Sequence, residues 1–199
     1  MPGNSLIESN NPMSEHTITI TSASAADAQA LADLFIGHIT AHPEYISHGE
    51  IQMGVGVGTI QGDRLITRPA PDAREKWIKY ILAEMSNDAI AHVWKAVDAE
   101  ESIMGFCVAD IIDNEDYAFG MVGDVLVHPQ SRGSGLGNTL LQTAISWLRS
   151  KGMQDIYLES GKDNHNAHRF FEKRGFIHVS EIYEYLPDTC PSSFPAPQQ

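Results

Sequence analysis

One turn in the C-terminal half of the chain carries the residue pattern that is best suited to chemistry. It reads Arg132-Gly133-Ser134-Gly135-Leu136-Gly137 and follows an apolar stretch that ends at Val127. The turn contains no proline, so each residue keeps a backbone N–H, and its glycines allow positive φ and the close approach of a ligand oxygen. Arg132 adds a permanent positive charge. This pattern is typical of a site that binds a phosphate group.

The segment after the turn is predicted to form a helix whose N-terminus points at this site. Its apolar residues recur at the spacing of one buried helical stripe: Leu136, Leu140, Leu141, Ala144, Ile145 and Leu148. The unpaired N–H groups of the first helical turn and the positive end of the helix dipole favour an anion there. A tight strand-to-helix connection without a ligand is the alternative interpretation.

Two other phosphate-binding motifs fit the sequence less well. A dinucleotide-binding turn expects an acidic residue about 20 residues further on, and Asp155 and Glu159 lie near that distance. However, such a turn usually opens its domain, whereas this one follows several predicted strands. A P-loop requires Gly-Lys-Ser/Thr, and here Gly161-Lys162 is followed by Asp163.

Taken with a second segment, the turn resembles the acyl-CoA-binding motif of the GNAT family of N-acetyltransferases, Arg/Gln-x-x-Gly-x-Gly/Ala. The second family signature runs from Asn164 to Phe176, and a predicted strand at 156–160 separates the two. The resemblance is strong over residues 118–186 and only topological over 17–117. It implies an α/β (α+β) fold: a single GNAT-fold domain with a mixed central β-sheet of six to seven strands and four helices, in which splayed parallel strands form the acyl-CoA cleft.

The resemblance also implies that acetyl-CoA is a co-substrate and indicates where it binds. The pyrophosphate is expected on the N–H groups of residues 132–137, and the pantetheine beside the backbone of the strand that ends at Val127. The implied cofactor-binding residues are Leu126, Val127, Arg132, Gly133, Ser134, Gly135, Leu136, Gly137, Asn164, Ala167 and Phe171.

Acetyl transfer to an amine also calls for a base, and two carboxylates are candidate catalytic residues. An aliphatic amine with a pKa near 10.4 is mostly protonated at pH 7, and deprotonating it costs about 4.6 kcal/mol. Asp124 precedes the expected acetyl-binding backbone on its strand, and Glu159 ends the neighbouring strand. A bound water molecule is the third possibility. Strand alternation puts Asp124 on one face with Leu126 and His128, without showing which face meets the cleft.

The chain departs from the family at the group that protonates the departing thiolate. Family members commonly carry a tyrosine just before Glu-Lys-x-Gly-Phe, and that position is Phe171 here. Since a thiol pKa is about 8.5, releasing a thiolate at neutral pH costs only about 2 kcal/mol. The substitution is therefore expected to slow transfer without preventing it. Tyr183, Tyr185 and His168 are possible substitutes.

The predicted activity is transfer of acetyl from acetyl-CoA to a primary amine of a small cationic molecule or a lysine side chain, in a ternary complex. Thirteen basic and 26 acidic residues give a net charge of −13, which argues against a nucleic-acid partner. The charge suits a cationic acceptor, but an acidic surface that keeps the protein soluble is the more general interpretation. The alternatives are a weakly catalytic acyl-CoA-binding regulatory module, or a GNAT enzyme with another acyl donor or a tRNA-borne acceptor. A homodimer is possible because dimers are frequent in the family.

Composition predicts a cytoplasmic protein with no membrane partner and no metal. The chain has 199 residues, 42% of them hydrophobic, which suits one ordinary globular domain. We find no apolar run of about 18 residues and no secretion signal at the N-terminus. Two cysteines, Cys107 and Cys190, provide neither a disulfide framework nor metal-ligand spacing.

The predicted domain covers residues 16–187, between tails at 1–15 and 188–199 that are expected to be disordered because they are polar and rich in Pro, Ser, Asn or Gln. The predicted strands are 17–21, 91–97, 102–112, 118–127, 156–159 and 176–186. Predicted helices begin after Ser24 and after Asp72, span 135–151, and run from Asn164 to Gly175.

An insert at about 40–70 fits the family pattern poorly. It contains a predicted hairpin around Gly62-Asp63, and His38, His42 and His48 lie in or near it without a metal-ligand spacing. We expect this insert to shape the acceptor side of the cleft. A surface loop, or a hairpin that pairs with a second subunit, is the alternative.

Overall fold

The computed structural model describes residues 18–62 and 64–184, and the chain divides into two compact units, 1–164 and 165–199. Both predicted tails therefore lie outside the described residues, as do Thr17, Asp63 and Tyr185.

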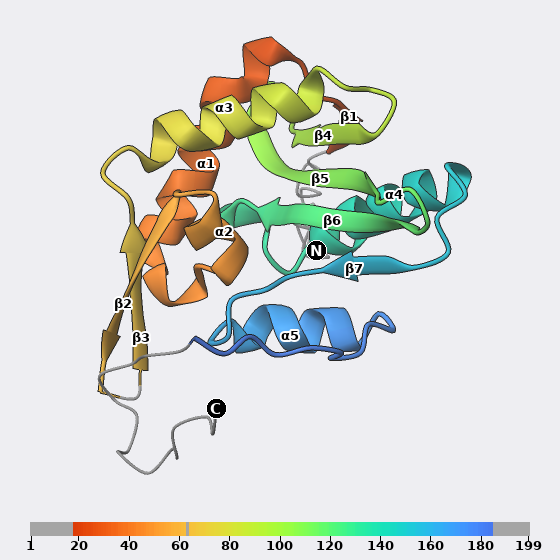
Figure 1. The fold of residues 1–199 in the computed structure, drawn as a ribbon. Helices are drawn as coiled ribbons and strands as arrows, with labels where there is room; N and C mark the ends of the chain where they lie inside the picture. The colour runs from red at the N-terminus through yellow and green to blue at the C-terminus, as the bar shows by residue number, and fades with distance from the viewer. Residues whose placement is uncertain (1–17, 63, 185–199) are drawn as a thin grey trace, which may run out of the picture. The chain divides into compact units, whose positions relative to one another are not determined.

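A five-stranded sheet forms the centre of the first unit (Figure 1). Its order is β1 (Thr19–Ser22), β4 (Ala91–Val97), β5 (Ile103–Asp113), β6 (Ala118–Val127) and β7 (Ile156–Leu158). Neighbouring strands are antiparallel except β6 and β7, which are parallel. The mixed sheet predicted from the sequence is confirmed, and the predicted bounds of β4 and β6 agree with the structure.

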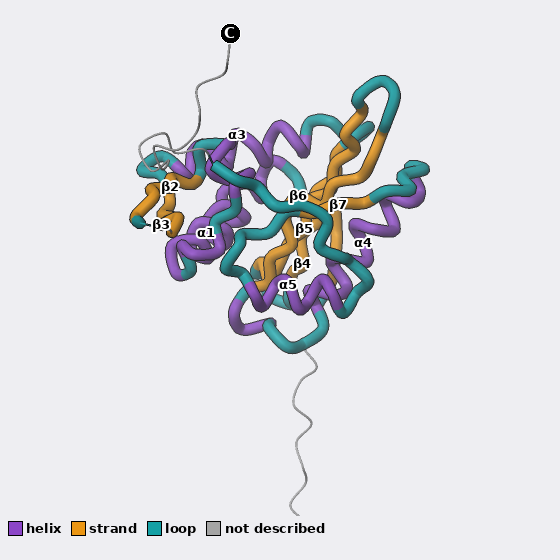
Figure 2. Tube along the Cα trace, turned by 60° about the horizontal axis from the view of Figure 1, so that its bottom comes forward, coloured by secondary structure: helices purple, strands orange, loops and turns teal. Residues whose placement is uncertain are grey.

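Helices cover both faces of this sheet, as Figures 1 and 2 show. They are α1 (Ala28–Ala41) and α3 (Ala73–Met85) on one face and α4 (Leu136–Ser150) on the other. Successive side chains of β5 point to opposite faces of the sheet. Phe106 packs edge-on against Trp77 of α3, whereas the Cys107 thiol donates to the Leu140 carbonyl of α4 on the other face. Cys107 is thus a core residue.

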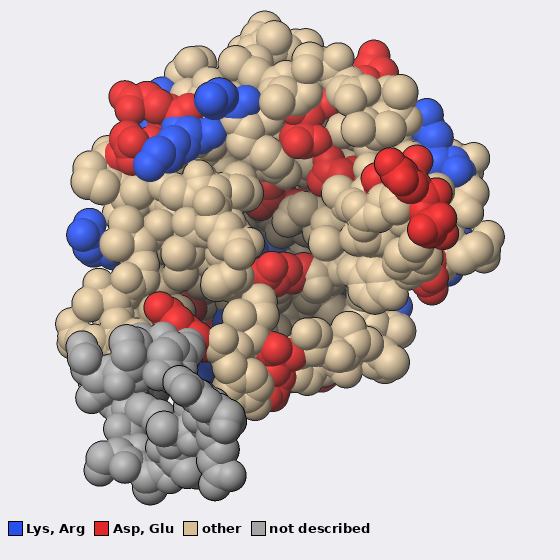
Figure 3. Space-filling view, viewed as in Figure 1, with Lys and Arg blue, Asp and Glu red and all other residues tan. Residues whose placement is uncertain are grey.

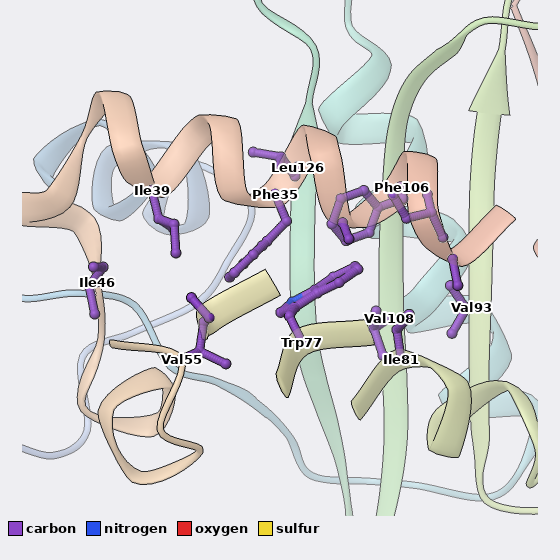
Figure 4. Packing of buried hydrophobic residues seen from close by; sticks show 14 of the residues in the cluster. Phe35, Ile39, Ile46, Val55, Trp77, Ile81, Val93, Phe106, Val108 and Leu126 are labelled. Carbon is purple, nitrogen blue, oxygen red and sulfur yellow. The ribbon is translucent and has the colours of Figure 1, made fainter. Parts of the chain in front are cut away.

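The core between α1, α3 and the sheet is built on aromatic rings (Figure 4). Phe35 of α1 stacks on Trp77 with ring centroids 4.8 Å apart, and Ile81 and Val108 are fully buried beside them. Burying side chains of this size stabilises the fold by about 1.5–3 kcal/mol each. On α3, Trp77 and Ile81 face this core, while Leu82 is 37% exposed.

The insert folds into elements of its own. The predicted hairpin is confirmed as a separate two-stranded sheet, β2 (Gly56–Gln61) with β3 (Arg64–Pro69), and a short helix α2 (His48–Gln52) precedes it. The seven strands of the described residues are therefore divided between two sheets, and α2 brings the α-helices to five where four were predicted. Three short 3-10 helices lie at Ala25–Asp27, Pro43–Tyr45 and Pro129–Ser131.

Two irregularities of β6 open the sheet. The partners of Val108 and Ala109 on β6 are Asp124 and Val122, so Gly123 is an extra residue that forms a β-bulge. The pairing of β6 with β7 ends at Val122 and Leu158. The rest of β6, to Val127, has no ladder partner on that side among the described residues, so the predicted splaying of the parallel strands is confirmed.

The second unit contains α5 (His165–Glu172) and the segment after it. Gly175 ends the helix with φ +90°, as predicted, and the Phe176 N–H donates to the Phe171 carbonyl. The strand predicted at 176–186 is wrong for its described part, 176–184, which forms none. Ile177 and Tyr183 are 79% and 85% exposed. An apolar pattern gives a strand only when another strand supplies the hydrogen bonds and the packing surface.

Candidate active site

The predicted phosphate turn connects β6 to α4 through the 3-10 helix Pro129–Ser131. Its two central glycines adopt the left-handed conformation, with φ +81° at Gly133 and +91° at Gly135, and Gly135 is the N-cap of α4. A Cβ atom at either position would meet no atom within 4 Å. The glycines are therefore required by the backbone conformation, and the space beside them is open to a ligand.

Only some of the turn's amides are free for that ligand. The N–H groups of Arg132 and Ser134 donate to carbonyls one turn back, and that of Leu136 donates to the Ser134 hydroxyl at 3.4 Å. The amides of Gly133 and Gly135 have no acceptor within the described part of the chain. The turn thus presents its glycine amides as anion donors while its other amides hold its shape.

Arg132 extends from the turn toward α1 and lines a cavity of about 490 Å³. Its Nη2 lies 3.4 Å from Nδ1 of His38. Burial lowers the pKa of His38 to about 4, and the adjacent Arg132 charge lowers it further in the same direction. At neutral pH the His38 ring is therefore uncharged and able to accept a hydrogen bond from the guanidinium. Leu126 and Val127 line the same cavity.

The His38 ring is supported by neighbours from the start of the insert. The His38 and His42 ring centroids are 5.3 Å apart, and His42 stacks on Tyr45 at 4.9 Å. No group of three or more His, Cys, Asp or Glu residues in the described ranges is arranged to hold a metal ion. His38 and His42 instead form part of the cavity wall.

Asp124, a predicted base, lies on the face of the sheet that α1 and α3 cover, because it pairs with Val108 of β5. The residue is half-buried, and no hydrogen bond reaches its carboxyl group from the described residues. Burial raises the pKa of Asp124 to about 8, with further contributions from the charges of Glu50 and Glu84. A carboxylate with this pKa is a far stronger base than an exposed aspartate.

Glu159, the other predicted base, is exposed just beyond the end of β7. Its Oε1 accepts the N–H of Gly49 in α2 at 2.8 Å. Two residues later the chain touches the insert again, where a Cβ on Gly161 would lie 2.2 Å from the Tyr45 carbonyl oxygen. The insert therefore lies against the segment that follows β7, on the side of the cleft expected to receive the acceptor.

Five carboxylates from five segments gather in what we call the acidic hollow: Glu50 of α2, Glu84 of α3, Asp110 of β5, Asp124 of β6 and Glu159. Figure 3 shows acidic side chains around a hollow in the middle of this face. None of the five forms an ion pair with a lysine or arginine among the described residues. The hollow is therefore an uncompensated negative site.

Burial, reinforced by contacts between the carboxylates, favours their protonated forms. Burial raises the pKa of Asp110 to about 9, and the close Glu84 carboxyl group and the charge of Asp124 raise it further. Burial also raises the pKa of Glu50, against the lowering effect of the Ser47 N–H and hydroxyl that cap α2, while Glu159 adds repulsion. The hollow thus binds protons near neutral pH when no other cation is present.

Tyr80 of α3 brings a hydroxyl group to the same place. A Cβ on Gly123 would lie 2.9 Å from the Tyr80 hydroxyl oxygen and 3.3 Å from Oδ2 of Asp110, so both groups lie against the β-bulge. Burial, followed by the charges of Asp124 and Asp110, raises the pKa of Tyr80. Tyr80 is therefore a neutral hydroxyl at the edge of the acidic hollow.

The structure brings some predicted site residues together and leaves others apart. Asp124 and Glu159 both belong to the acidic hollow, while residues 132–137 form the turn at the end of β6. Asn164 closes the first unit, where its N–H donates to the Gly161 carbonyl at 2.9 Å. Ala167 and Phe171 belong to the second unit, where Phe171 packs edge-on against Phe176.

Sequence reasoning missed three carboxylates of the acidic hollow, Glu84, Asp110 and Glu50, and also Tyr80 at its edge. A weak signal existed for Tyr80, Glu84 and Asp110. Tyr80 and Glu84 are one helical turn apart, and Asp110 follows Val108 on the same face of β5. Nothing in the sequence pattern indicates that α2 would bring Glu50 to the same site.

Comparison with known proteins agrees with this geometry. The family model "Acetyltransferase (GNAT) family" matches residues 61–176. N-alpha-acetyltransferase 30 of Schizosaccharomyces pombe is 24% identical over 57% of this chain and 76% of its own length. Mycothiol acetyltransferase of Actinosynnema mirum is 33% identical over 45% of this chain, but the match spans only 29% of that enzyme.

Solved structures show the same fold at low sequence identity. A predicted acetyltransferase from Clostridium acetobutylicum, solved with acetyl-CoA, has a TM-score of 0.62 and 18% identity, covering 85% of this chain and 96% of its own. An aminoglycoside antibiotic 6'-N-acetyltransferase from Acinetobacter baumannii has a TM-score of 0.60 and 13% identity, covering 85% and 97%.

Among the described residues no helix combines the length and the apolar character that a membrane span requires.

The family model matches more than half of the chain and includes β6, the phosphate turn and β7. This protein therefore belongs to the GNAT family of acetyltransferases and is an acyltransferase enzyme.

Proposed function

We propose that this enzyme transfers an acetyl group from acetyl-CoA to a primary amine on a small cationic molecule or a lysine side chain. One observation carries the proposal: β6 holds Asp124 in the acidic hollow and leads, through the 3-10 helix Pro129–Ser131, into the glycine turn that begins at Arg132. A single strand thus connects a site for a cationic acceptor with a site for a phosphate-bearing donor.

The donor side fits coenzyme A in its charge and in its available hydrogen-bond donors. The free amides of Gly133 and Gly135, the N-terminus of α4 and the Arg132 guanidinium all favour a pyrophosphate. The cavity of about 490 Å³ beside Leu126 and Val127 offers room for part of a pantetheine arm. When bound, acetyl-CoA supplies an activated thioester carbonyl.

On the acceptor side, Asp124 is the proposed base. Its raised pKa, about 8, brings it closer to the pKa of an aliphatic amine, near 10.4, and therefore lowers the cost of proton transfer between them. The surrounding carboxylates attract the protonated amine into the hollow. Glu159, held by the Gly49 amide, is the alternative base.

Transfer then follows in one displacement. The ammonium group gives one proton to Asp124, and the resulting amine nitrogen bonds to the acetyl carbon. The C–S bond then breaks with both electrons remaining on sulfur, and the second nitrogen proton passes to the departed thiolate as the amide forms. From Gly123 to Val127, β6 has no strand partner on the β7 side. On that side it offers backbone N–H groups to the carbonyl oxygen as this oxygen becomes negative. The thiolate needs no acid for release, which is compatible with Phe171 at the family's tyrosine position.

The test is the release of free CoA after mixing the protein with acetyl-CoA and an amine panel of small aliphatic amines, aminoglycosides, amino acids and lysine peptides. We expect turnover on cationic primary amines and none on their N-acetylated forms. Acetyl-CoA binding is measured in parallel by calorimetry. Tight acetyl-CoA binding with no turnover on any amine would contradict the proposed function.

A further inference from the structure

The acidic hollow contains more negative charge than one reacting amine requires. Asp124 alone can attract and deprotonate an amine, yet Glu84 and Asp110 lie nearby without a cationic partner among the described residues. Burying unpaired carboxylates costs free energy, because the charged forms lose hydration. A ligand that supplies a second positive charge removes this cost.

Two polar groups of the hollow also have unmet hydrogen-bonding capacity. Oδ1 of Asp110 is buried and has no hydrogen-bond partner in the described structure. The Tyr80 hydroxyl lies against the bulge at Gly123, and no hydrogen bond to it is found among the described residues. A buried polar atom without a partner, such as Oδ1 of Asp110, is uncommon in native proteins. Its position beside Asp124 and the Tyr80 hydroxyl indicates a ligand with N–H donors.

Strand geometry gives the spacing between the two acidic positions. Asp124 pairs with Val108, and Asp110 follows on the same face of β5. Asp110 is therefore the diagonal cross-strand neighbour of Asp124, and such neighbours lie roughly 7–8 Å apart in an antiparallel pair. An extended chain of about five carbons between two nitrogens, with bonds of about 1.5 Å, spans a similar distance.

We propose that the acceptor is a linear diamine or polyamine whose reacting amine lies at Asp124 and whose second, protonated amine lies between Glu84 and Asp110. This inference rests on the proposed function and narrows its acceptor to one class. The Tyr80 hydroxyl accepts an N–H from the acceptor. The absence of a side chain at Gly123 leaves room for this hydroxyl at the β-bulge. Glu84 and Asp110 are then residues that determine specificity, outside the chemical step.

Binding of such an acceptor should also release protons. In the empty hollow the raised pKa, about 9 at Asp110, keeps a proton on the Glu84 and Asp110 pair at neutral pH. An ammonium group placed between these two side chains favours their ionised forms. The other titratable groups that face the pair are Tyr80, Asp124, Glu50 and Glu159. Calorimetry in buffers of different ionisation enthalpy measures the protons released.

The experiment compares unbranched diamines of two to six carbons with monoamines of equal length, by kcat/KM and by calorimetric binding. The variants are Glu84→Gln and Asp110→Asn. The matched control is Glu75→Gln, which removes the same charge from an exposed position of α3. We expect the wild type to favour a diamine of about five carbons over its monoamine at least 30-fold. The two variants should reduce this preference below threefold because they lower kcat/KM more for the diamine than for the monoamine, and Glu75→Gln should retain the preference.

The outcomes separate this inference from the proposed function. Equal kcat/KM for diamines and monoamines overturns the inference and leaves the transferase in place. Diamine binding that Glu84→Gln weakens, with no turnover on any amine, contradicts the proposed function and supports the diamine site. Equal losses for monoamines and diamines in Glu84→Gln show a structural effect and overturn the specificity role.

Discussion

The phosphate turn and the acidic hollow are both attached to β6, yet they are built in opposite ways. In the proposed function the turn binds its ligand through backbone amides that two glycines expose, and its geometry depends on six consecutive residues. The hollow binds through side chains from five separate segments, and its electrostatics depend on burial. A donor site made of backbone amides, such as the turn, suits a common phosphate-bearing ligand. An acceptor site made of side chains, such as the hollow, can change its acceptor through single substitutions.

The largest effect is expected from Gly135→Val. At φ +91° a β-branched residue is strained, and relaxing the strain moves the amides that face the ligand. We expect CoA affinity measured by calorimetry to fall more than 100-fold. Gly152→Val is the matched control, because Gly152 has φ +89° at the other end of α4 and similar open space. Unchanged CoA affinity in a folded Gly135→Val protein would refute the phosphate-binding role.

Asp124→Asn tests the other region. Loss of a general base typically lowers the rate 10²- to 10⁴-fold, and we expect kcat/KM to fall by about 100-fold. In the wild type, kcat/KM should rise with pH through about 8 as Asp124 ionises. In the variant this rise should move to higher pH, where the free amine forms unaided. A pH profile identical to that of the wild type would move the role of base to Glu159 or to water.

The same contrast explains how much the sequence predicted. The turn and its flanking elements were predicted nearly to the residue, because neighbouring residues determine a glycine turn and an amphipathic helix. Asp124 and Glu159 were predicted as candidate bases, but Glu84 and Asp110 were not, since only tertiary packing brings α3 and β5 together at the bulge. The strand expected at 176–184 failed for the same reason, because a strand depends on a distant partner.

Stability should depend on pH through the hollow and not through the turn. The folded-state pKa values of Asp124 and Asp110, about 8 and about 9, lie above the unfolded value near 4. Unfolding therefore releases protons in this window, and stability falls as pH rises from about 4 to 9. Asp110→Asn should then raise the melting temperature at pH 9 by several degrees and have little effect at pH 4.5. A wild-type melting temperature that stays constant between these pH values contradicts the raised pKa values.

His38→Ala should have the smallest effect and sharpens the contrast at the donor site. The neutral His38 ring accepts from Arg132, so its removal frees the guanidinium without changing the backbone of the turn. Losing one such hydrogen bond costs about 0.5–1.5 kcal/mol, which corresponds to a roughly two- to tenfold weaker affinity for CoA. His38→Gln, which keeps an acceptor, should restore part of this loss. Equal affinity of the wild type and His38→Ala would show that amides and helix dipole alone hold the phosphate, with Arg132 free to turn toward solvent.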